Sequence, residues 1–159
     1  MASWGYNAYG QLGLGTTGDV HRPTLIPGMH SIAAVSANAF DGYALSTSGA
    51  LVAWGNNQNG SVGDGTTTNR LSPVAVSGLS SDVSQVIGSG YEGAYRLTAQ
   101  VVLADGSVRT WGMNNMGQLG DGSTTTRLAP ITPTLPAGCP GIATLGQSKT
   151  VRNLLISKT

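Results

Sequence analysis

Charged side chains are scarce in this sequence, and the few that occur are spread along it. Only 9% of the 159 residues are Asp, Glu, Lys or Arg, and the formal net charge is +1. Proteins that bind nucleic acids usually carry a concentrated basic surface. We therefore expect no nucleic-acid partner. The low charge, together with abundant Gly, Ser and Thr, favours short strands and tight turns over charged amphipathic helices.

Cysteine and long apolar runs are also nearly absent. Cys139 is the single cysteine, so no disulfide forms within the chain, and cysteine usage leaves the redox compartment open. No run approaches the ~20 apolar residues of a membrane-spanning helix, and the opening MASWGYNAYG lacks the features of a secretory signal peptide. We expect a soluble protein without a membrane partner, either cytoplasmic or the mature part of an exported protein.

Glycine, in contrast, is abundant, and many of its 24 copies fall in three versions of one phrase. The versions read WGYNAYGQLGLGTT, WGNNQNGSVGDGTT and WGMNNMGQLGDGST. Tryptophan, glycine and asparagine recur at the same spacing in each version, as Trp4, Gly5 and Asn7, as Trp54, Gly55 and Asn57, and as Trp111, Gly112 and Asn114. Repetition at a fixed period of this kind indicates an array of similar structural units.

The chemistry of the phrase predicts strands joined by irregular loops. Apolar and β-branched residues precede Trp in ALVAWG and SVRTWG, which is typical of a strand that enters a turn. Glycine accepts positive φ and Asn side chains bond nearby backbone groups, so the segment after Trp is predicted to be a stabilised loop. A proline follows in each unit, as Pro23, Pro73 and Pro130. Repeats of ~40 to 50 residues with four short strands are the signature of a β-propeller blade, so we predict an all-β propeller.

The combination of WG.N..GQLG.G, a following proline and a DG turn before the next Trp strand resembles the regulator of chromosome condensation repeat. The resemblance covers nearly the whole chain. It departs from the family pattern at GSVG in the second copy, and at FDGYALSTSG and AYRLTAQVVLADG, which lack a histidine that the family usually carries. The resemblance implies a propeller that acts as a binding scaffold.

Members of that family include guanine-nucleotide exchange factors for the Ran GTPase and bacterial inhibitors of β-lactamase. Neither activity carries over to this chain. The exchange factors use seven blades and a basic arm that this chain lacks, and no inhibitory residue of the second group can be matched here.

The tryptophan spacing predicts one domain of three repeats, at about residues 4–53, 54–110 and 111–159. Three blades are too few to close a ring, because propellers have about four to eight. Two chains around a two-fold axis would supply six blades. We therefore predict a homodimer in which residues 1–5 complete the last blade of the partner chain. The alternative is a fragment of a seven-bladed parent.

The second repeat is longer than the first, and we place its extra residues within 87–99. This segment contains Tyr91, Glu92, Tyr95 and Arg96, an aromatic and charged group that the other repeats lack. We predict a contact loop there, because binding residues concentrate on loops. The alternative interpretation is a lengthened hairpin with tyrosines on its surface.

No catalytic or metal-binding group is recognisable in the sequence. His21 and His30 have no ligand partners at metal-site spacing, Asp64 and Asp121 stand in GDG turns, and Cys139 lacks an active-site signature. We predict no metal, no cofactor and a non-enzymatic binding scaffold for a protein or small ligand. The alternatives are an enzyme with a site at the ring centre or subunit junction, and a purely structural module.

Overall fold

The computed structural model describes residues 1–90, 97–139, 141–146 and 154–157, and these residues form strands, turns and loops. No helix in these ranges has the length and apolar character needed to span a membrane. The described strands are β1 (Ala2–Gly5), β2 (Val20–Leu25), β3 (Ile32–Ala37), β4 (Asp41–Ser46), β5 (Leu51–Gly55), β6 (Arg70–Ala75), β7 (Val83–Ser89), β8 (Thr98–Leu103), β9 (Val108–Gly112), β10 (Arg127–Ile131), β11 (Ile142–Gly146) and β12 (Leu154–Ser157).

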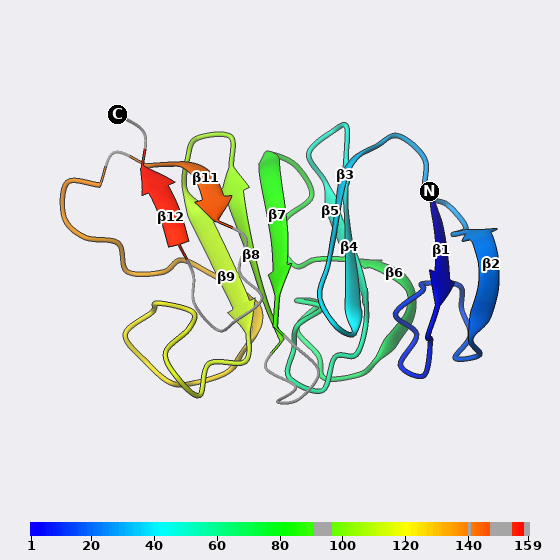
Figure 1. Cartoon of the computed structure of the whole chain (residues 1–159). Helices are drawn as coiled ribbons and strands as arrows, with labels where there is room; N and C mark the ends of the chain where they lie inside the picture. Colours follow the sequence, from blue (N-terminus) through cyan, green and yellow to red (C-terminus); the bar gives the residue numbers. More distant parts are fainter. Residues whose placement is uncertain (91–96, 140, 147–153, 158–159) are drawn as a thin grey trace.

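Four antiparallel sheets stand next to one another in a row (Figure 1). The two central sheets are four-stranded, in the orders β3-β4-β5-β6 and β7-β8-β9-β10. The outer two are two-stranded, β1-β2 at one end of the row and β11-β12 at the other. Consecutive strands pair within each sheet, as in a propeller blade. The all-β prediction is therefore confirmed.

The sequence repeat and the sheet are offset from each other by two strands. The strand that ends in WG is the third strand of a complete sheet, as β5 or β9, and the proline-containing strand is the fourth, as β6 or β10. The first two strands of the same sheet come from the end of the preceding repeat. Each complete sheet thus joins two neighbouring repeats.

The prolines occupy positions that the ladder tolerates. Pro73 lies in β6 and Pro130 in β10, which are the outermost strands of the two complete sheets. Proline has no N–H to donate, so within sheets it is confined mainly to edge strands. The repeated proline thus marks the edge strand of each complete sheet.

Two of the three tryptophans connect neighbouring sheets. Trp54 is buried and donates its indole N–H to the carbonyl of Gln11 in the preceding repeat, at 2.9 Å. Trp111 is also buried and donates in the same way to the carbonyl of Ser61, at 2.8 Å. The largest buried cluster, which includes Tyr43 of β4, packs around Trp111 between the two complete sheets. The tryptophans therefore combine core packing with a polar link between repeats.

A glycine forms the surface against which each buried indole lies. A Cβ added to Gly13 would lie 3.0 Å from the ring of Trp54, and a Cβ on Gly63 would lie 2.6 Å from Nε1 of Trp111. Both glycines also have positive φ, which L side chains rarely adopt. The repeated glycine is thus required for conformation and for space.

Alanine substitutions in the second loop separate these two requirements. Gly63→Ala adds a backbone cost of ~1 to 2 kcal/mol for the left-handed conformation and ~1 to 3 kcal/mol for overpacking against Trp111. Gly65→Ala is the matched control, because Gly65 has a φ of +83° but no atom within 4 Å of its added Cβ. We expect Gly63→Ala to lower the free energy of unfolding in urea clearly more than Gly65→Ala. Equal losses would contradict the close packing of Gly63 on the indole.

Candidate functional site

Three long loops lie at the same end of the row of sheets, the lower end in Figure 1. They cover residues 6–19, 56–69 and 113–126, and each leads from a WG strand to the following proline-containing strand. Loops that a rigid sheet holds in place are the usual location of binding residues. This loop end is therefore the first candidate contact surface.

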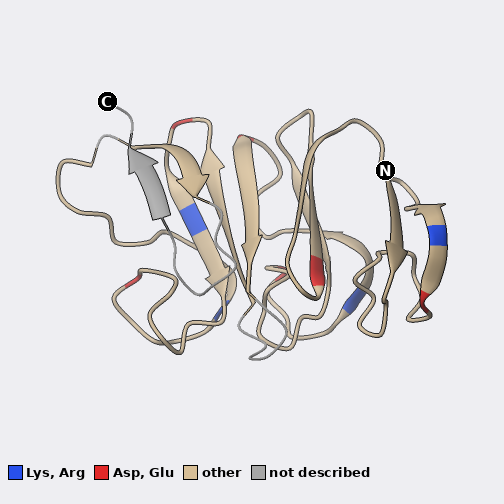
Figure 2. Cartoon of the chain, in the orientation of Figure 1, with Lys and Arg blue, Asp and Glu red and all other residues tan. Residues whose placement is uncertain are grey.

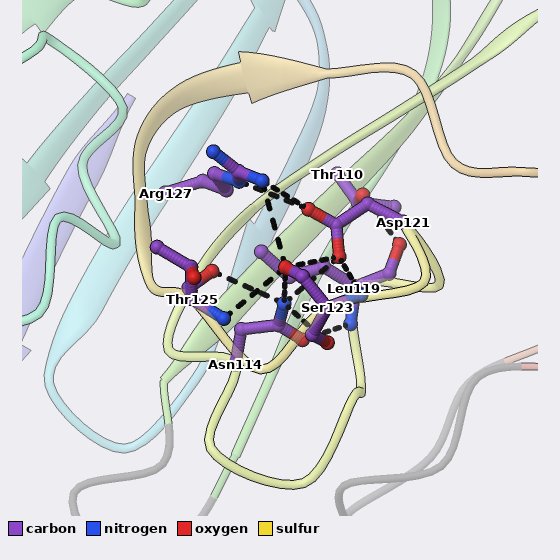
Figure 3. Close-up of polar contacts among 7 residues, drawn as sticks. All are labelled: Thr110, Asn114, Leu119, Asp121, Ser123, Thr125 and Arg127. Atoms are coloured by element: carbon purple, nitrogen blue, oxygen red, sulfur yellow. Dashed lines mark hydrogen bonds and ion pairs between the residues drawn. The ribbon is translucent and has the colours of Figure 1, made fainter.

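A buried asparagine organises the third loop (Figure 3). The Asn114 side chain donates from Nδ2 to the carbonyls of Ser123 and Thr125, each at 3.1 Å. Its Oδ1 accepts the backbone N–H of Leu119 at 2.9 Å. One side chain thus replaces the backbone pairing that an irregular loop lacks.

The same arrangement recurs in the other two loops. Asn7 donates to the carbonyls of Thr16 and Gly18, at 2.9 and 3.0 Å, and accepts from Leu12. Asn57 accepts from Val62 and donates to the carbonyl of Thr66, both at 3.0 Å. The prediction that the repeated Asn bonds loop backbone is confirmed, and its role is structural.

An ion pair reinforces the second and third loops. Arg70 contacts Asp64, and Arg127 donates from Nε and Nη2 to Oδ2 of Asp121, at 2.9 and 2.7 Å. Hydrogen bonds from Arg127, and then from Ser123, lower the pKa of Asp121. Both aspartates also accept the backbone N–H two residues further on, which confirms their predicted role in turns.

The other charged residues of the described ranges are scattered over strands and loops and do not gather in one region of the chain (Figure 2). Neither His21 nor His30 belongs to a group of three potential ligands, since no such group occurs in the ranges that the structure describes. The binding residues predicted from the longer second repeat, Tyr91, Glu92, Tyr95 and Arg96, lie outside those ranges. Their role stays a prediction.

The loop tips differ among the three repeats, although the loops share one frame. Four and five residues after each Trp, the chain carries Ala8 and Tyr9, then Gln58 and Asn59, then Asn115 and Met116. Ala8, Gln58, Asn115 and Met116 are exposed. A constant frame thus presents a small, variable set of uncharged side chains.

A second candidate contact surface is an open apolar cavity of about 390 Å³ beside β1. Its walls include Trp4 of β1, Val35 of β3, Tyr43 of β4 and Trp54 of β5. Trp4 is 60% exposed, whereas its equivalents in the later repeats are buried. This cavity is an exposed apolar surface of the kind that marks a contact site.

Behind this cavity lies a buried carboxyl group that sequence reasoning missed. Oδ2 of Asp41 accepts a hydrogen bond from Asn38 at 3.0 Å and lies 3.5 Å from the Tyr43 hydroxyl, which donates to the carbonyl of Ser61 at 2.9 Å. Burial raises the pKa of Asp41 to about 7. Its equivalent in the next complete sheet is Thr98, since both are paired with the glycine after Trp. Repetition therefore offered no signal for this residue.

Three similar solved structures are larger than this chain. Prp20p from Saccharomyces cerevisiae, described with its binding to Gsp1p and histones, matches with a TM-score of 0.78 and 19% identity over 98% of this chain and 38% of that chain. The same yeast protein bound to Kap60 matches with a TM-score of 0.78 and 20% identity, over 93% and 36%. Human WBSCR16 matches with a TM-score of 0.72 and 24% identity, over 91% and 37%.

This chain thus spans well under half the length of those proteins, and at these identities the likeness shows the fold. Among curated protein sequences, none matches this chain. The model of the Regulator of chromosome condensation (RCC1) repeat matches residues 3–39, 48–92 and 105–143, which together cover most of the chain. These matched ranges carry the three Trp-Gly phrases and their ordered loops, and the chain belongs to the regulator of chromosome condensation repeat family.

Proposed function

We propose that this chain is a non-enzymatic scaffold that binds a protein through its loop end. The observation that carries the proposal is the buried Asn frame, which holds three loops in fixed conformations while their tips differ. A loop that is already ordered loses little conformational entropy on binding, so its contacts contribute more fully to affinity. The scaffold role of related propellers supports this assignment in general terms.

The chemistry of the tips favours a protein surface over a charged ligand. Gln58, Asn115 and Met116 are exposed and uncharged, and the nearest acids, Asp64 and Asp121, are held by their own arginines. Methionine is enriched at protein interfaces, while Asn and Gln supply adaptable hydrogen bonds. The partner that we infer presents an apolar patch bordered by backbone or amide groups.

The named partners of the yeast relative belong to that protein. Gsp1p, histones and Kap60 are associated with a chain that this one covers by little more than a third. We do not carry these partners over. Tyr91, Glu92, Tyr95 and Arg96 are kept as an additional contact group on the basis of sequence alone.

The enzyme alternative has one observation to consider, the raised pKa of Asp41. Perturbed acids cluster at functional sites, but buried structural groups are perturbed too. Asp41 is only 2% exposed, and its neighbours include the side chains of Asn38, Tyr43 and Ser61, so a substrate would have no approach to it. We therefore assign Asp41 to the packing between sheets, where its titration affects stability.

Charge substitutions at the loop tips test the binding proposal. Gln58→Arg combined with Met116→Arg alters two exposed tips and leaves the Asn frame intact. Proteins captured from an extract of the native cells by the wild-type chain are compared with those captured by the variant, using quantitative mass spectrometry. The purified candidate partner is then titrated by calorimetry. We expect at least ~10-fold weaker binding, because a desolvated charge opposes apolar contact.

The matched control for this experiment is Leu25→Arg, at the far end of β2 from the loops. Leu25 is exposed, so the control carries the same kind of charge at an equally accessible position. It should bind the purified partner with wild-type affinity. A partner that loses affinity for the control and not for the tip variant would contradict the proposed surface.

The structural assignment of Asp41 predicts a pH dependence of stability. The folded chain keeps the proton up to about pH 7, whereas the unfolded carboxyl, with a pKa of 3.8, releases it earlier. The unfolded state thus binds fewer protons between these values, and stability falls as pH rises through this window. We expect a loss on the order of 3 kcal/mol in urea unfolding. Asp41→Asn should remove most of it.

Asp121→Asn is the control for that titration. The pKa of Asp121 is lowered, so its contribution is present above the ordinary carboxyl pKa and disappears only at more acidic pH. This variant should therefore keep the wild-type slope between pH 4 and 7. A wild-type chain whose stability is level across this window would refute the buried, protonated carboxyl.

A further inference from the structure

Two internal junctions between repeats share one set of contacts. At the first, the Trp54 indole donates to the Gln11 carbonyl at 2.9 Å, and the N–H of Gly15 donates to the carbonyl of Leu71 at 2.8 Å. In both bonds the loop of one repeat contacts the strands of the next repeat. The two contacts thus link the loop of the first repeat to β5 and to β6.

The second junction repeats these contacts one unit later. Trp111 donates to the Ser61 carbonyl at 2.8 Å, and the N–H of Gly65 donates to the carbonyl of Leu128 at 2.9 Å. Both indoles are buried. Two independent instances therefore define the geometry of a complete junction.

Strand β1 carries the equivalent tryptophan, Trp4, but the contacts that surround Trp54 and Trp111 are not formed there. Trp4 is 60% exposed, against 3% for Trp54 and 0% for Trp111, and within the described residues its indole N–H has no hydrogen-bond acceptor. An exposed tryptophan at a position that buries its equivalents is a large unpartnered apolar surface. It lies at the free side of β1, which pairs only with β2 in the described part of the chain.

The inner strand next to β1 is uncovered as well. Val35 in β3 and Val86 in β7 are equivalent, because each is paired with the matching residue of the following strand, Ala44 or Val101. Val35 is 61% exposed and Val86 is 8% exposed. Val86 belongs to the buried cluster whose strand residues come from β4, β5, β7, β8 and β9, whereas Val35 lines the open cavity beside Trp4.

The third loop offers the other half of such a junction. Gln118 is seven residues after its Trp, as are Gln11 and Ser61, and Gly122 corresponds to Gly15 and Gly65. Gly120 is the equivalent of Gly13 and Gly63, but its nearest neighbour to an added Cβ is Pro133 at 3.4 Å, with no indole within 4 Å. Gly120 therefore offers a tryptophan the same packing position as Gly13 and Gly63, but no indole lies against it.

The strands at the two ends of the row also match each other in register. In the complete sheets, the residue before Trp is paired with Tyr43 or Gln100, and each of these is the third residue of the second strand. Applied to β12 through its pairing with β11, the same register places Ser3 opposite Leu154. The sheet β11-β12 supplies two inner strands, and β1-β2 supplies two outer strands.

We propose that β11-β12 of one copy pairs with β1-β2 of a second copy, and that Trp4 of the second copy donates its indole N–H to the Gln118 carbonyl of the first. The Gly122 N–H donates to the His21 carbonyl of the second copy, as Gly15 and Gly65 do within the chain. Two such junctions related by a two-fold axis close a ring. Each copy contributes two complete and two half sheets, so the ring has six blades, inside the range of known propellers.

A second copy is the occupant that we propose, because β1-β2 and β11-β12 are complementary half sheets that do not pair with each other among the described residues of one copy. Figure 1 shows β1-β2 and β11-β12 at opposite ends of the row, so one chain does not bring its own ends together. The proposed interface continues the two internal junctions with the same residue types at the same spacing. In this assembly, the inner strands β11-β12 of the first copy cover Val35 of the second copy and fill its apolar cavity.

The solution mass of the 159-residue chain, measured by light scattering after gel filtration, is the first test. We expect twice the 16.1 kDa of one chain, with no further growth as concentration rises. Trp4→Ala should weaken the dimer on the order of 100-fold or more, because each ring has two such anchors and buried Trp residues dominate interfaces. A wild-type monomer, or oligomers that grow with concentration, would overturn the closed pair.

Folding and assembly are separable in this experiment. Trp4 is exposed in a single copy, so its truncation leaves the packing of that copy intact, and the circular dichroism spectrum of the variant should match the wild type. Leu25→Ala is the matched control, because Leu25, Ala75 and Thr132 occupy equivalent positions that are exposed in all three repeats. A Trp4→Ala mass that equals the Leu25→Ala mass would refute the role of the indole.

Disulfide trapping tests the strand register. In a Cys139→Ser background, Ser3→Cys combined with Leu154→Cys should give a covalent dimer on oxidation, visible on a denaturing gel without reductant. Each single cysteine variant is a control, because the proposed axis does not place two copies of position 3 or of position 154 opposite each other. Equal crosslinking in single and double variants would exclude this pairing. None of these results depends on the loop-tip partner, which the Gln58 and Met116 substitutions test separately.

Discussion

The hydrogen bond from a tryptophan indole to a carbonyl of the preceding repeat is the contact on which the arrangement of the sheets depends. In Trp54 and Trp111 it lies within a buried, packed junction, where the indole N–H would otherwise be an unsatisfied buried donor. The planar indole packs closely against a residue that has no side chain, and Gly13 and Gly63 are the residues that it contacts. The bond fixes the angle of the ring, and the glycine fixes how closely the next sheet approaches.

The offset between repeat and sheet makes this junction cooperative. Each complete sheet takes two strands from one repeat and two strands from the next repeat. A single repeat on its own would therefore form only two incomplete sheets. Stability in repeat proteins comes largely from the interfaces between neighbours. Here covalent continuity, strand pairing and the tryptophan contact all cross the same boundary, so the repeats support one another.

The loops divide structural and contact roles between different residues. The loop backbone is hydrogen-bonded by three buried side chains, Asn7, Asn57 and Asn114. The exposed residues at the loop tips are therefore not needed for these hydrogen bonds. Asp64 and Asp121 also bond within their loops, to Arg70 and Arg127. The tips can therefore change in size and polarity without loss of the frame, which is the property that a binding scaffold requires.

The sequence by itself determined the all-β class, the repeat and the local chemistry of each loop. Those features depend on residues close together in the chain, such as Asn114 and the backbone that it bonds, and periodicity reveals them. The predicted contact residues Tyr91, Glu92, Tyr95 and Arg96 also rest on the sequence, through the greater length of the second repeat and their aromatic and charged side chains. Only the tertiary structure decided that Asp41 is buried, because its equivalent Thr98 is a different residue and burial comes from a neighbouring repeat. It also decided that Trp4 is exposed while Trp54 is buried, since identical residues differ there only in whether a preceding repeat lies against them.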